Sequence, residues 1–219
     1  MISTGNDIIA FAETDNDRTS LHRFYSRIFS PREFLLYDGL TGLSFPVFVW
    51  LMWSIKESVY KYVSRADPRL RFAPLKIPVN RLRQREGYYE GLICYGGLSL
   101  YSRSFPGEET IMTVVSEEIG FTHVRWGIQA IGGSDYSTQS ALVRTFALQS
   151  LSTALPGAAL RIIRTADGPP EVWDDERPLN IPLSLAHHGR YVAWSYRLPV
   201  MNSYRLPANS SSYRKSAAN

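Results

Sequence analysis

The feature that most constrains the fold of this chain is its most apolar segment, LSFPVFVWLMW at residues 43–53, which leads directly into charged residues. The segment is too short to span a bilayer, so we expect it to be buried inside the protein. A helix can begin at residue 44 or 45, just before Pro46, and continue to about Ser64, ahead of Asp67-Pro68. The sequence therefore predicts one long buried helix.

The composition is that of an ordinary globular protein. Hydrophobic residues make up 44% of the 219 residues, and 24 Lys and Arg against 20 Asp and Glu give a net charge of +4. This small excess suits an anionic partner without specifying one, and no nucleic-acid recognition motif accompanies it. Cys94 is the single cysteine, which rules out an intrachain disulfide and a multi-cysteine zinc site. The N-terminus lacks a signal-peptide pattern, so we expect a cytoplasmic protein without a membrane span.

The segments that precede the apolar one predict a strand and further helices. DIIAFA at 7–12 has the pattern of a short buried strand, and 17–29 has that of an amphipathic helix with a basic side. Ser30 and Glu33 match a capping box, which predicts the start of another helix that ends near residue 39.

The rest of the chain is rich in strand patterns separated by turn residues. Around a further helix at 138–155, the strand candidates are 70–79, 91–104, 110–118, 123–131, 159–166, 171–173 and 181–198, the last with a break at 188–190. We expect an α+β fold with an antiparallel or mixed sheet packed on the long helix. It would form a single domain over 1–205, or two intimately joined lobes, followed by a flexible tail over 206–219.

The charged residues after the apolar segment lie on the second half of the predicted helix. Trp53, Glu57 and Lys61 follow one another at four-residue intervals and share one face, whereas Lys56 lies about 100° around the helix from Glu57. On spacing alone, the simplest interpretation is an exposed ion pair between Glu57 and Lys61. A carboxylate and an ammonium group on one face can also hold Mg²⁺ and phosphate oxygens, but Mg²⁺ would need a second acid from elsewhere in the chain.

Five short motifs occur in a particular order along the chain. They are Gly5-Asn6-Asp7, Phe29-Ser30-Pro31-Arg32-Glu33, Trp53-Ser54-Ile55-Lys56-Glu57-Ser58-Val59-Tyr60-Lys61, Gly168-Pro169-Pro170 and Ser184-Leu185-Ala186-His187. In this order they resemble the 4'-phosphopantetheinyl transferase superfamily, specifically its holo-(acyl-carrier-protein) synthase branch. The resemblance covers about residues 5–79 and 159–198, and leaves about 80–158 as a β-rich insertion. Ala186 replaces a serine of the family pattern, and Pro169 stands where a basic residue is frequent.

The resemblance implies transfer of phosphopantetheine from coenzyme A to a serine of a carrier protein, with release of adenosine 3',5'-bisphosphate. Asp7 and Glu57 would then be Mg²⁺ ligands, Lys61 a contact to phosphate oxygens, and Glu57 also the acceptor of the serine proton. Lys56 is a weaker candidate for a cofactor contact, and His187 is expected to contact a cofactor phosphate. Taken alone, Asp7 could equally be a turn residue, and His187 a strand histidine satisfied by backbone partners.

The resemblance also bears on partners and assembly. Carrier proteins are acidic around the modified serine, so Arg18, Arg23 and Arg27 are expected to dock the acyl carrier protein; the alternative is an ordinary solvated face. Short synthases are trimers and longer relatives are monomers with two like halves, and the sequence leaves both states open. Two other interpretations stay open: a catalytically silent homologue that binds coenzyme A or a carrier protein, and an unrelated α+β enzyme that uses a carboxylate–lysine pair.

Overall fold

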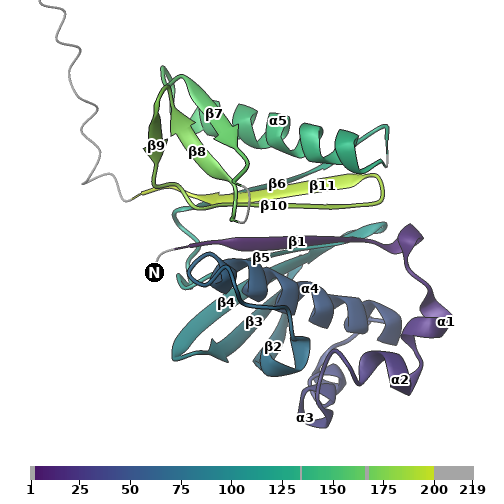
Figure 1. Cartoon of the computed structure of the whole chain (residues 1–219). Helices are drawn as coiled ribbons and strands as arrows, with labels where there is room; N and C mark the ends of the chain where they lie inside the picture. Colours follow the sequence, from purple (N-terminus) through teal and green to yellow (C-terminus); the bar gives the residue numbers. More distant parts are fainter. Residues whose placement is uncertain (1–2, 134, 166–167, 200–219) are drawn as a thin grey trace, which may run out of the picture.

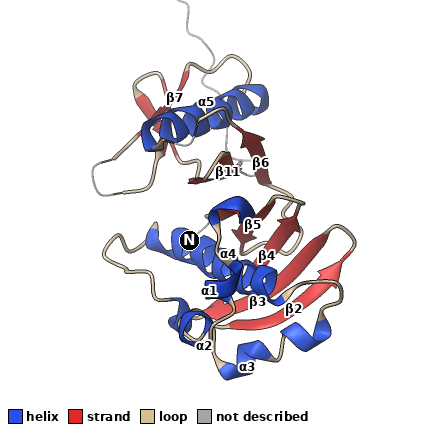
Figure 2. Cartoon of the chain, turned by 90° about the vertical axis from the view of Figure 1, so that its right-hand side faces the viewer, coloured by secondary structure: helices blue, strands red, loops and turns tan. Residues whose placement is uncertain are grey.

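The computed structural model describes residues 3–133, 135–165 and 168–199, which form two halves stacked on each other (Figure 1). Each half combines one long helix with antiparallel strands, as the view turned by 90° also shows (Figure 2). The expected α+β class with antiparallel sheets is therefore confirmed. Within the described ranges, no helix is both long and apolar enough to cross a membrane.

The first half is a five-stranded sheet with one long helix on it. Its strands are β1 (Gly5–Ala10), β2 (Val79–Arg85), β3 (Tyr88–Tyr95), β4 (Leu98–Pro106) and β5 (Thr110–Ser116), in the spatial order β1-β5-β4-β3-β2. The predicted long helix is α4 (Phe45–Ser64), and its buried side chains share a core with the sheet. Gly5 allows β1 to approach α4 closely, because a Cβ atom at this position would lie only 2.0 Å from the carbonyl oxygen of Ser58.

The second half repeats this arrangement with shorter strands. Its elements in chain order are β6 (Val124–Ala130), α5 (Tyr136–Ala154), β7 (Leu160–Ile163), β8 (Glu171–Asp174), β9 (Arg177–Leu179), β10 (Leu183–His188) and β11 (Tyr191–Arg197). The strands form two sheets, with the orders β10-β11-β6 and β7-β8-β9. In both halves the last strand of the chain segment lies between the first strand and the next-to-last strand. The resulting orders are β1-β5-β4 in the first half and β6-β11-β10 in the second.

The region expected to be an insertion, 80–158, does not form a separate unit. It contains most of the first sheet, from β2 to β5, and also β6 and α5 of the second half. Both halves would be incomplete without it. The sequence did not reveal this repetition because the halves share an order of elements without a repeated sequence motif.

The halves meet along β1 and β10. Because β1 lies at the edge of its sheet, side chains of β10 accept hydrogen bonds from its backbone N–H groups. Ser184 Oγ accepts from Asn6 N at 3.1 Å, and His188 Nδ1 accepts from Ala10 N at 2.9 Å. These side-chain hydrogen bonds connect the two sheets at this seam.

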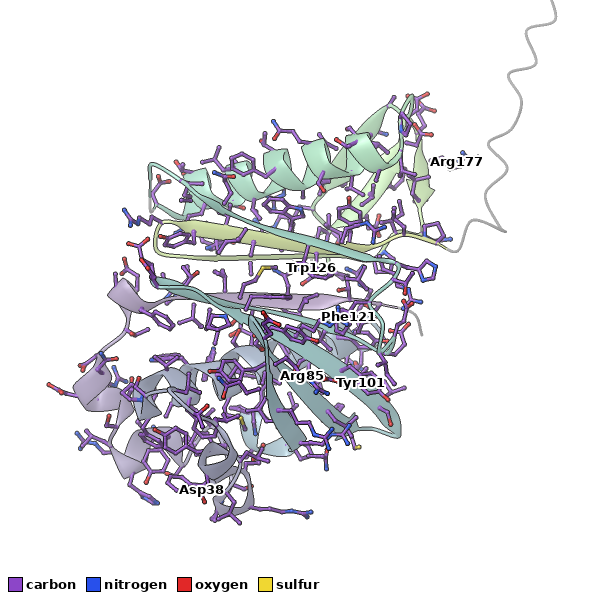
Figure 3. The ribbon with its side chains drawn as sticks, turned by 180° about the vertical axis from the view of Figure 1, so that it is seen from behind. Asp38, Arg85, Tyr101, Phe121, Trp126 and Arg177 are labelled. Atoms are coloured by element: carbon purple, nitrogen blue, oxygen red, sulfur yellow. The ribbon has the colours of Figure 1, made fainter. Side chains whose placement is uncertain are left out.

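An aromatic cluster packs where the chain passes from the first half into the second (Figure 3). Trp126 of β6 stacks on Phe105 of β4, with ring centroids 5.5 Å apart. Phe121, in the connection before β6, contacts the same tryptophan edge-on at 6.1 Å. The connection between the halves is therefore packed into a small core of its own.

One predicted helix is broken. The segment 17–29 forms two short helices, α1 (Asn16–Thr19) and α2 (His22–Tyr25), in place of one amphipathic helix. The hydroxyl of Ser20 donates to the carbonyl oxygen of Asn16 at 2.9 Å. The backbone then becomes extended at Leu21, with φ −75° and ψ 133°, so α1 ends before α2 begins.

Several strand predictions also change. The segment 70–79 is largely not a strand, because Pro74 begins a 3-10 helix and β2 starts only at Val79. The segment 91–104 is two strands, β3 and β4, which reverse at Gly96 and Gly97 with φ angles of 57° and 80°. Strand β9 was not predicted, and the tail expected over 206–219 lies outside the described residues.

Candidate active site

Strand β1 and helix α4 bring two carboxylates to one lysine. Lys61 Nζ lies 3.3 Å from Asp7 Oδ1 and 3.2 Å from Glu57 Oε1. The four-residue spacing places Glu57 and Lys61 on one face of α4, and the close approach at Gly5 brings β1 to that face. Trp53 Nε1 donates to Glu57 Oε2 at 2.8 Å and so orients this carboxylate. The structure therefore brings together the three residues of the predicted acid–lysine site.

Burial gives this cluster unusual electrostatics. Asp7 is only 5% exposed, and burial raises the pKa of its carboxyl group to about 7, although the charge of Lys61 acts in the opposite direction. Burial also acts to lower the pKa of Lys61, but the negative charges of Asp7 and Glu57 outweigh this effect, so the pKa is raised. Lys61 therefore stays cationic, whereas Asp7 exchanges its proton near neutral pH.

The two carboxylates fit a magnesium ion that is shared with a phosphate ligand. Their common contact with Lys61 shows that both reach one cation, and Asp7 Oδ2 is buried without a hydrogen-bond partner among the described residues. No cluster of three or more His, Cys, Asp and Glu side chains in the described ranges could hold a metal. Mg²⁺ is commonly bound by one or two carboxylates, with water and substrate phosphates as the other ligands. The donor set thus suits Mg²⁺ in the presence of such a substrate.

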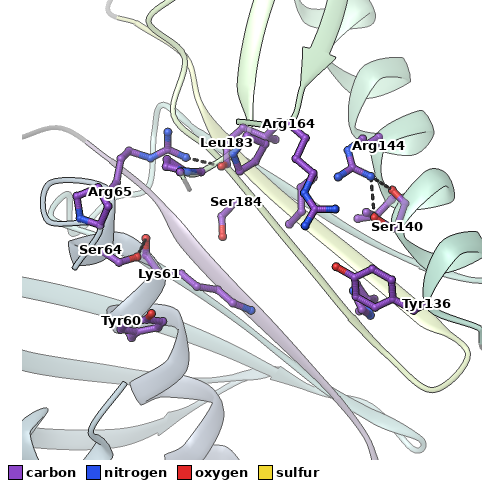
Figure 4. Close-up of a pocket in the computed structure, with 17 residues that line it drawn as sticks. Tyr60, Lys61, Ser64, Arg65, Tyr136, Ser140, Arg144, Arg164, Leu183 and Ser184 are labelled. Carbon is purple, nitrogen blue, oxygen red and sulfur yellow. Dashed lines mark hydrogen bonds between the residues drawn. The ribbon is translucent and has the colours of Figure 1, made fainter. Parts of the chain in front are cut away.

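A cationic cleft with a volume of about 360 Å³ adjoins this cluster (Figure 4). Both halves line it, with α4 on one side and β10, α5, Arg164 and residues 168–170 on the others. Four of its lining side chains are cationic, namely Lys61, Arg65, Arg144 and Arg164, and none of the described lining residues is acidic. An apolar ligand would not need this excess of positive charge, whereas a ligand with several phosphates would.

His187 of β10 lies in the same cleft. Its ring meets that of Tyr136 edge-on, with centroids 5.2 Å apart. Burial lowers the pKa of His187, and the positive charges of Lys61, His188 and Arg144 lower it further. The imidazole is therefore neutral near pH 7, and it can donate one hydrogen bond to a phosphate oxygen.

The two departures from the family pattern occupy different places. Ala186 is buried and packs with Ile8 of β1, on the side of β10 that carries Ser184 and His188 to the seam between the halves. It does not line the cleft, whereas Pro169 does. Only Pro169 therefore changes the surface that a ligand in the cleft would meet.

Lys56 is paired within the protein core. Its side chain is fully buried, and its Nζ lies 2.7 Å from Glu33 Oε1 and 3.0 Å from the carbonyl oxygen of Pro74. Glu33 also completes the predicted capping box of α3 (Pro31–Phe34) and accepts from Val79 N at 2.9 Å. The expected cofactor contact of Lys56 is therefore not supported, because its ammonium group is satisfied by α3 and the segment before β2.

The three arginines expected to bind a carrier protein are exposed but do not share one helix. Arg18 lies on α1, where its guanidinium stands 5.5 Å from the ring centroid of Phe24. Arg23 lies on α2, and Arg27 follows that helix. All three arginines lie at the surface, although the continuous helix that was expected to carry them does not form.

The sequence does not reveal the cleft residues Arg65, Arg144 and Arg164. No motif marks them, and an arginine on α5 or in a loop has the same sequence signature as a solvated one. Only the packing of the second half against the first, along β1 and β10, shows that they line a common cleft. The net charge of +4 was the one available signal, and a net charge does not indicate which residues gather at a site.

Together, the fold and the site define an α+β protein with two carboxylates and a lysine beside a cationic cleft, a combination suited to a phosphate-bearing ligand. Residues 3–106 match the model of the 4'-phosphopantetheinyl transferase superfamily, and this part of the chain is a domain of that superfamily. The match supports a phosphopantetheinyl transferase in general. It continues beyond residue 79, where the resemblance was expected to stop, and it does not include 159–198. No curated protein and no solved structure matched the chain.

Proposed function

We propose that this protein transfers the 4'-phosphopantetheine group from coenzyme A to a serine hydroxyl of an apo carrier protein, with Mg²⁺ held by Asp7 and Glu57. The observation that carries this proposal is the convergence of both carboxylates on Lys61, at a cleft that contains three further cationic side chains. Coenzyme A bears a diphosphate and a 3'-phosphate, so its binding needs several cationic groups. The superfamily match of residues 3–106 supports the same class of reaction.

The reaction moves a phosphoryl group from one oxygen to another. The serine oxygen forms a bond to the phosphorus that carries pantetheine, and the bond from this phosphorus to the bridging diphosphate oxygen breaks. Adenosine 3',5'-bisphosphate leaves with that oxygen, and Glu57 accepts the serine proton directly or through a water molecule. Lys61 binds phosphate oxygens, and His187 donates to a phosphate in the same cleft. A bound Mg²⁺ would neutralise charge on the diphosphate.

Arg18, Arg23 and Arg27 would guide the carrier protein to this site. All three are exposed, and an acidic carrier would be attracted by their charges. Such complementarity acts mainly on the rate of association and on orientation, and it weakens with salt. A carrier of fatty acid biosynthesis is one such partner, and these arginines do not distinguish it from the carrier of another pathway.

The test is to incubate the protein with coenzyme A, Mg²⁺ and an apo carrier protein, and to measure the mass of the carrier. The carrier should gain one phosphopantetheine group with wild-type protein, and should gain none with Asp7→Asn or Glu57→Gln. Arg69→Met is a suitable control, because the side chain of Arg69 is 93% exposed and lies outside the cleft. Absence of any mass gain with every apo carrier encoded by the same genome would contradict the proposal.

A catalytically silent homologue that binds coenzyme A is the second candidate function. The observation in its favour is Pro169, which places a rigid, uncharged residue in the lining of the cleft where relatives frequently have a basic one. Calorimetry together with the carrier mass assay separates the two functions, because a silent homologue would bind coenzyme A without modifying any carrier.

A further inference from the structure

Among the described residues that line the cleft, Arg65 is the one with a buried side-chain nitrogen that lacks a hydrogen-bond partner. It caps the C-terminus of α4, four residues after Lys61, and both side chains line the cleft (Figure 4). One terminal nitrogen of its guanidinium donates to the carbonyl oxygen of Leu183 on β10. Its Nε is buried and has no hydrogen-bond partner among the described residues. A buried donor without a partner costs free energy, so a hydrogen-bond acceptor at this nitrogen would be stabilising.

The surroundings of Arg65 show what kind of acceptor suits it. The cleft has no acidic lining residue in the described ranges, so no carboxylate of the protein faces Arg65 from that side. The nearest negative influence is Glu171, which lines a neighbouring cavity of about 280 Å³ that Arg65 also borders. A guanidinium presents parallel N–H groups that match the oxygens of a phosphate.

We propose that Arg65 is a phosphate-binding residue of this cleft, and that its contact with Leu183 makes binding depend on both halves. This inference rests on the proposed function, since coenzyme A is taken as the ligand. Lys61 lies at the end of the cleft with the two carboxylates, and Arg65 lies one helical turn farther along α4. The two cations would thus bind different parts of one extended ligand. Either the diphosphate or the 3'-phosphate of coenzyme A can supply the oxygens at Arg65.

Calorimetry with the full chain tests this inference. Arg65→Met should bind coenzyme A about tenfold to a hundredfold more weakly than wild type, the range expected for loss of a charged hydrogen bond. The affinity of Arg65→Lys should be intermediate, because lysine keeps the charge but lacks the parallel N–H groups of the guanidinium. Arg69→Met provides the matched control and should bind like wild type, since Arg69 lies at the surface.

Two further ligands identify the phosphate. If Arg65 binds the 3'-phosphate, dephospho-coenzyme A should bind equally to wild type and Arg65→Met, whereas adenosine 3',5'-bisphosphate should bind the variant more weakly. If Arg65 binds the diphosphate, dephospho-coenzyme A should lose affinity for the variant as coenzyme A does. Both results support a phosphate-binding residue.

The outcomes that overturn the inference are distinct from those that overturn the proposed function. Unchanged affinity of Arg65→Met for coenzyme A, with only a lower melting temperature of the unliganded protein, would leave Arg65 as a structural link to Leu183. Wild-type protein that binds none of the three ligands would also overturn the inference. Wild-type protein that binds coenzyme A but modifies no carrier would overturn the proposed enzyme activity and leave the inference on Arg65 standing.

Discussion

Among single residues, Asp7 and Lys56 show two different outcomes for a buried ionisable group. Lys56 has a carboxylate and a carbonyl oxygen as partners, so its burial is compensated within the protein. Asp7 shares Lys61 with Glu57, and one of its oxygens is buried without a partner in the described structure. The incomplete satisfaction of Asp7 fits a ligand-binding role, whereas the satisfied pair of Lys56 fits a role in stability.

Asp7 makes the stability of the unliganded protein depend on pH. Its carboxyl group holds a proton up to about pH 7 in the folded state but releases it near 3.8 when the chain is unfolded. The resulting stabilisation is fully present below about pH 3.8 and is lost as the pH rises through about 7. Asp7→Asn lacks this titration, so its melting temperature relative to wild type should rise over that range, by roughly 2–4 °C for each kcal/mol. The same difference in melting temperature between Asp7→Asn and wild type at every pH, measured without added metal, would contradict this prediction.

Lys56→Met should reduce stability without changing the site. The substitution leaves Glu33 buried without its cation, which should lower the free energy of unfolding by about 3 kcal/mol in a urea titration. The affinity for coenzyme A and the transfer rate per folded molecule should stay at wild-type values, because Lys56 does not line the cleft. Lys76→Met serves as control, since Lys76 is exposed. A large loss of coenzyme A affinity with unchanged stability would restore the cofactor contact that the sequence suggested for Lys56.

Between elements, the position of β1 on α4 depends on Gly5. A methyl group at Gly5 would meet the backbone of Ser58 and Tyr62, which cannot move independently of the helix. Gly5→Ala should therefore cost about 1–3 kcal/mol of stability and shift Asp7 away from Lys61, so that transfer activity falls as well. Gly39→Ala is the matched control, because nothing lies within 4 Å of a Cβ atom there. Similar unfolding curves for the two variants would show that this close contact does not position β1.

The sequence predicted elements well where pattern and local chemistry agree. The long helix has an apolar sequence, a proline at its start and a stop after it, and it forms as α4. The capping box at Ser30 and Glu33 also forms, because both partners are local. The break after Ser20 was missed because the apolar spacing continues across Leu21, where the backbone is extended. The cleft arginines were missed because their proximity depends on the docking of the two halves.

At the scale of the whole molecule, the cleft has walls from both halves of one chain. Lys61 and Arg65 come from α4, whereas Arg144 comes from α5 and His187 from β10. The superfamily match ends at residue 106, so the second wall lies entirely outside it. The contribution of this wall can therefore be tested separately from that of the matched part.

Arg144→Met should affect ligand binding more than the chemical step. Arg144 lines the cleft from α5, where it donates to Ser140, and it does not contact the carboxylates. Loss of its charge should raise KM for coenzyme A about tenfold while kcat changes little. Lys61→Met should instead lower kcat, because Lys61 contacts Asp7 and Glu57. Arg161→Met is the control, since Arg161 lies over Trp173 outside the cleft. An unchanged KM in Arg144→Met would remove α5 from the binding site.

Because both walls belong to one chain, we expect the active species to be a monomer, with a light-scattering mass near 24.8 kDa. A mixing experiment tests the same point through function. Lys61→Met and Arg144→Met carry defects in opposite halves, and in an oligomer with sites shared between copies, mixing them would create some sites with both residues intact. In a monomer no such site can form, so activity at low coenzyme A should equal the sum of the separate variants. Activity above that sum, or the mass of an obligate trimer, would show that neighbouring copies complete the site, as they do in the short synthases that the motifs resemble.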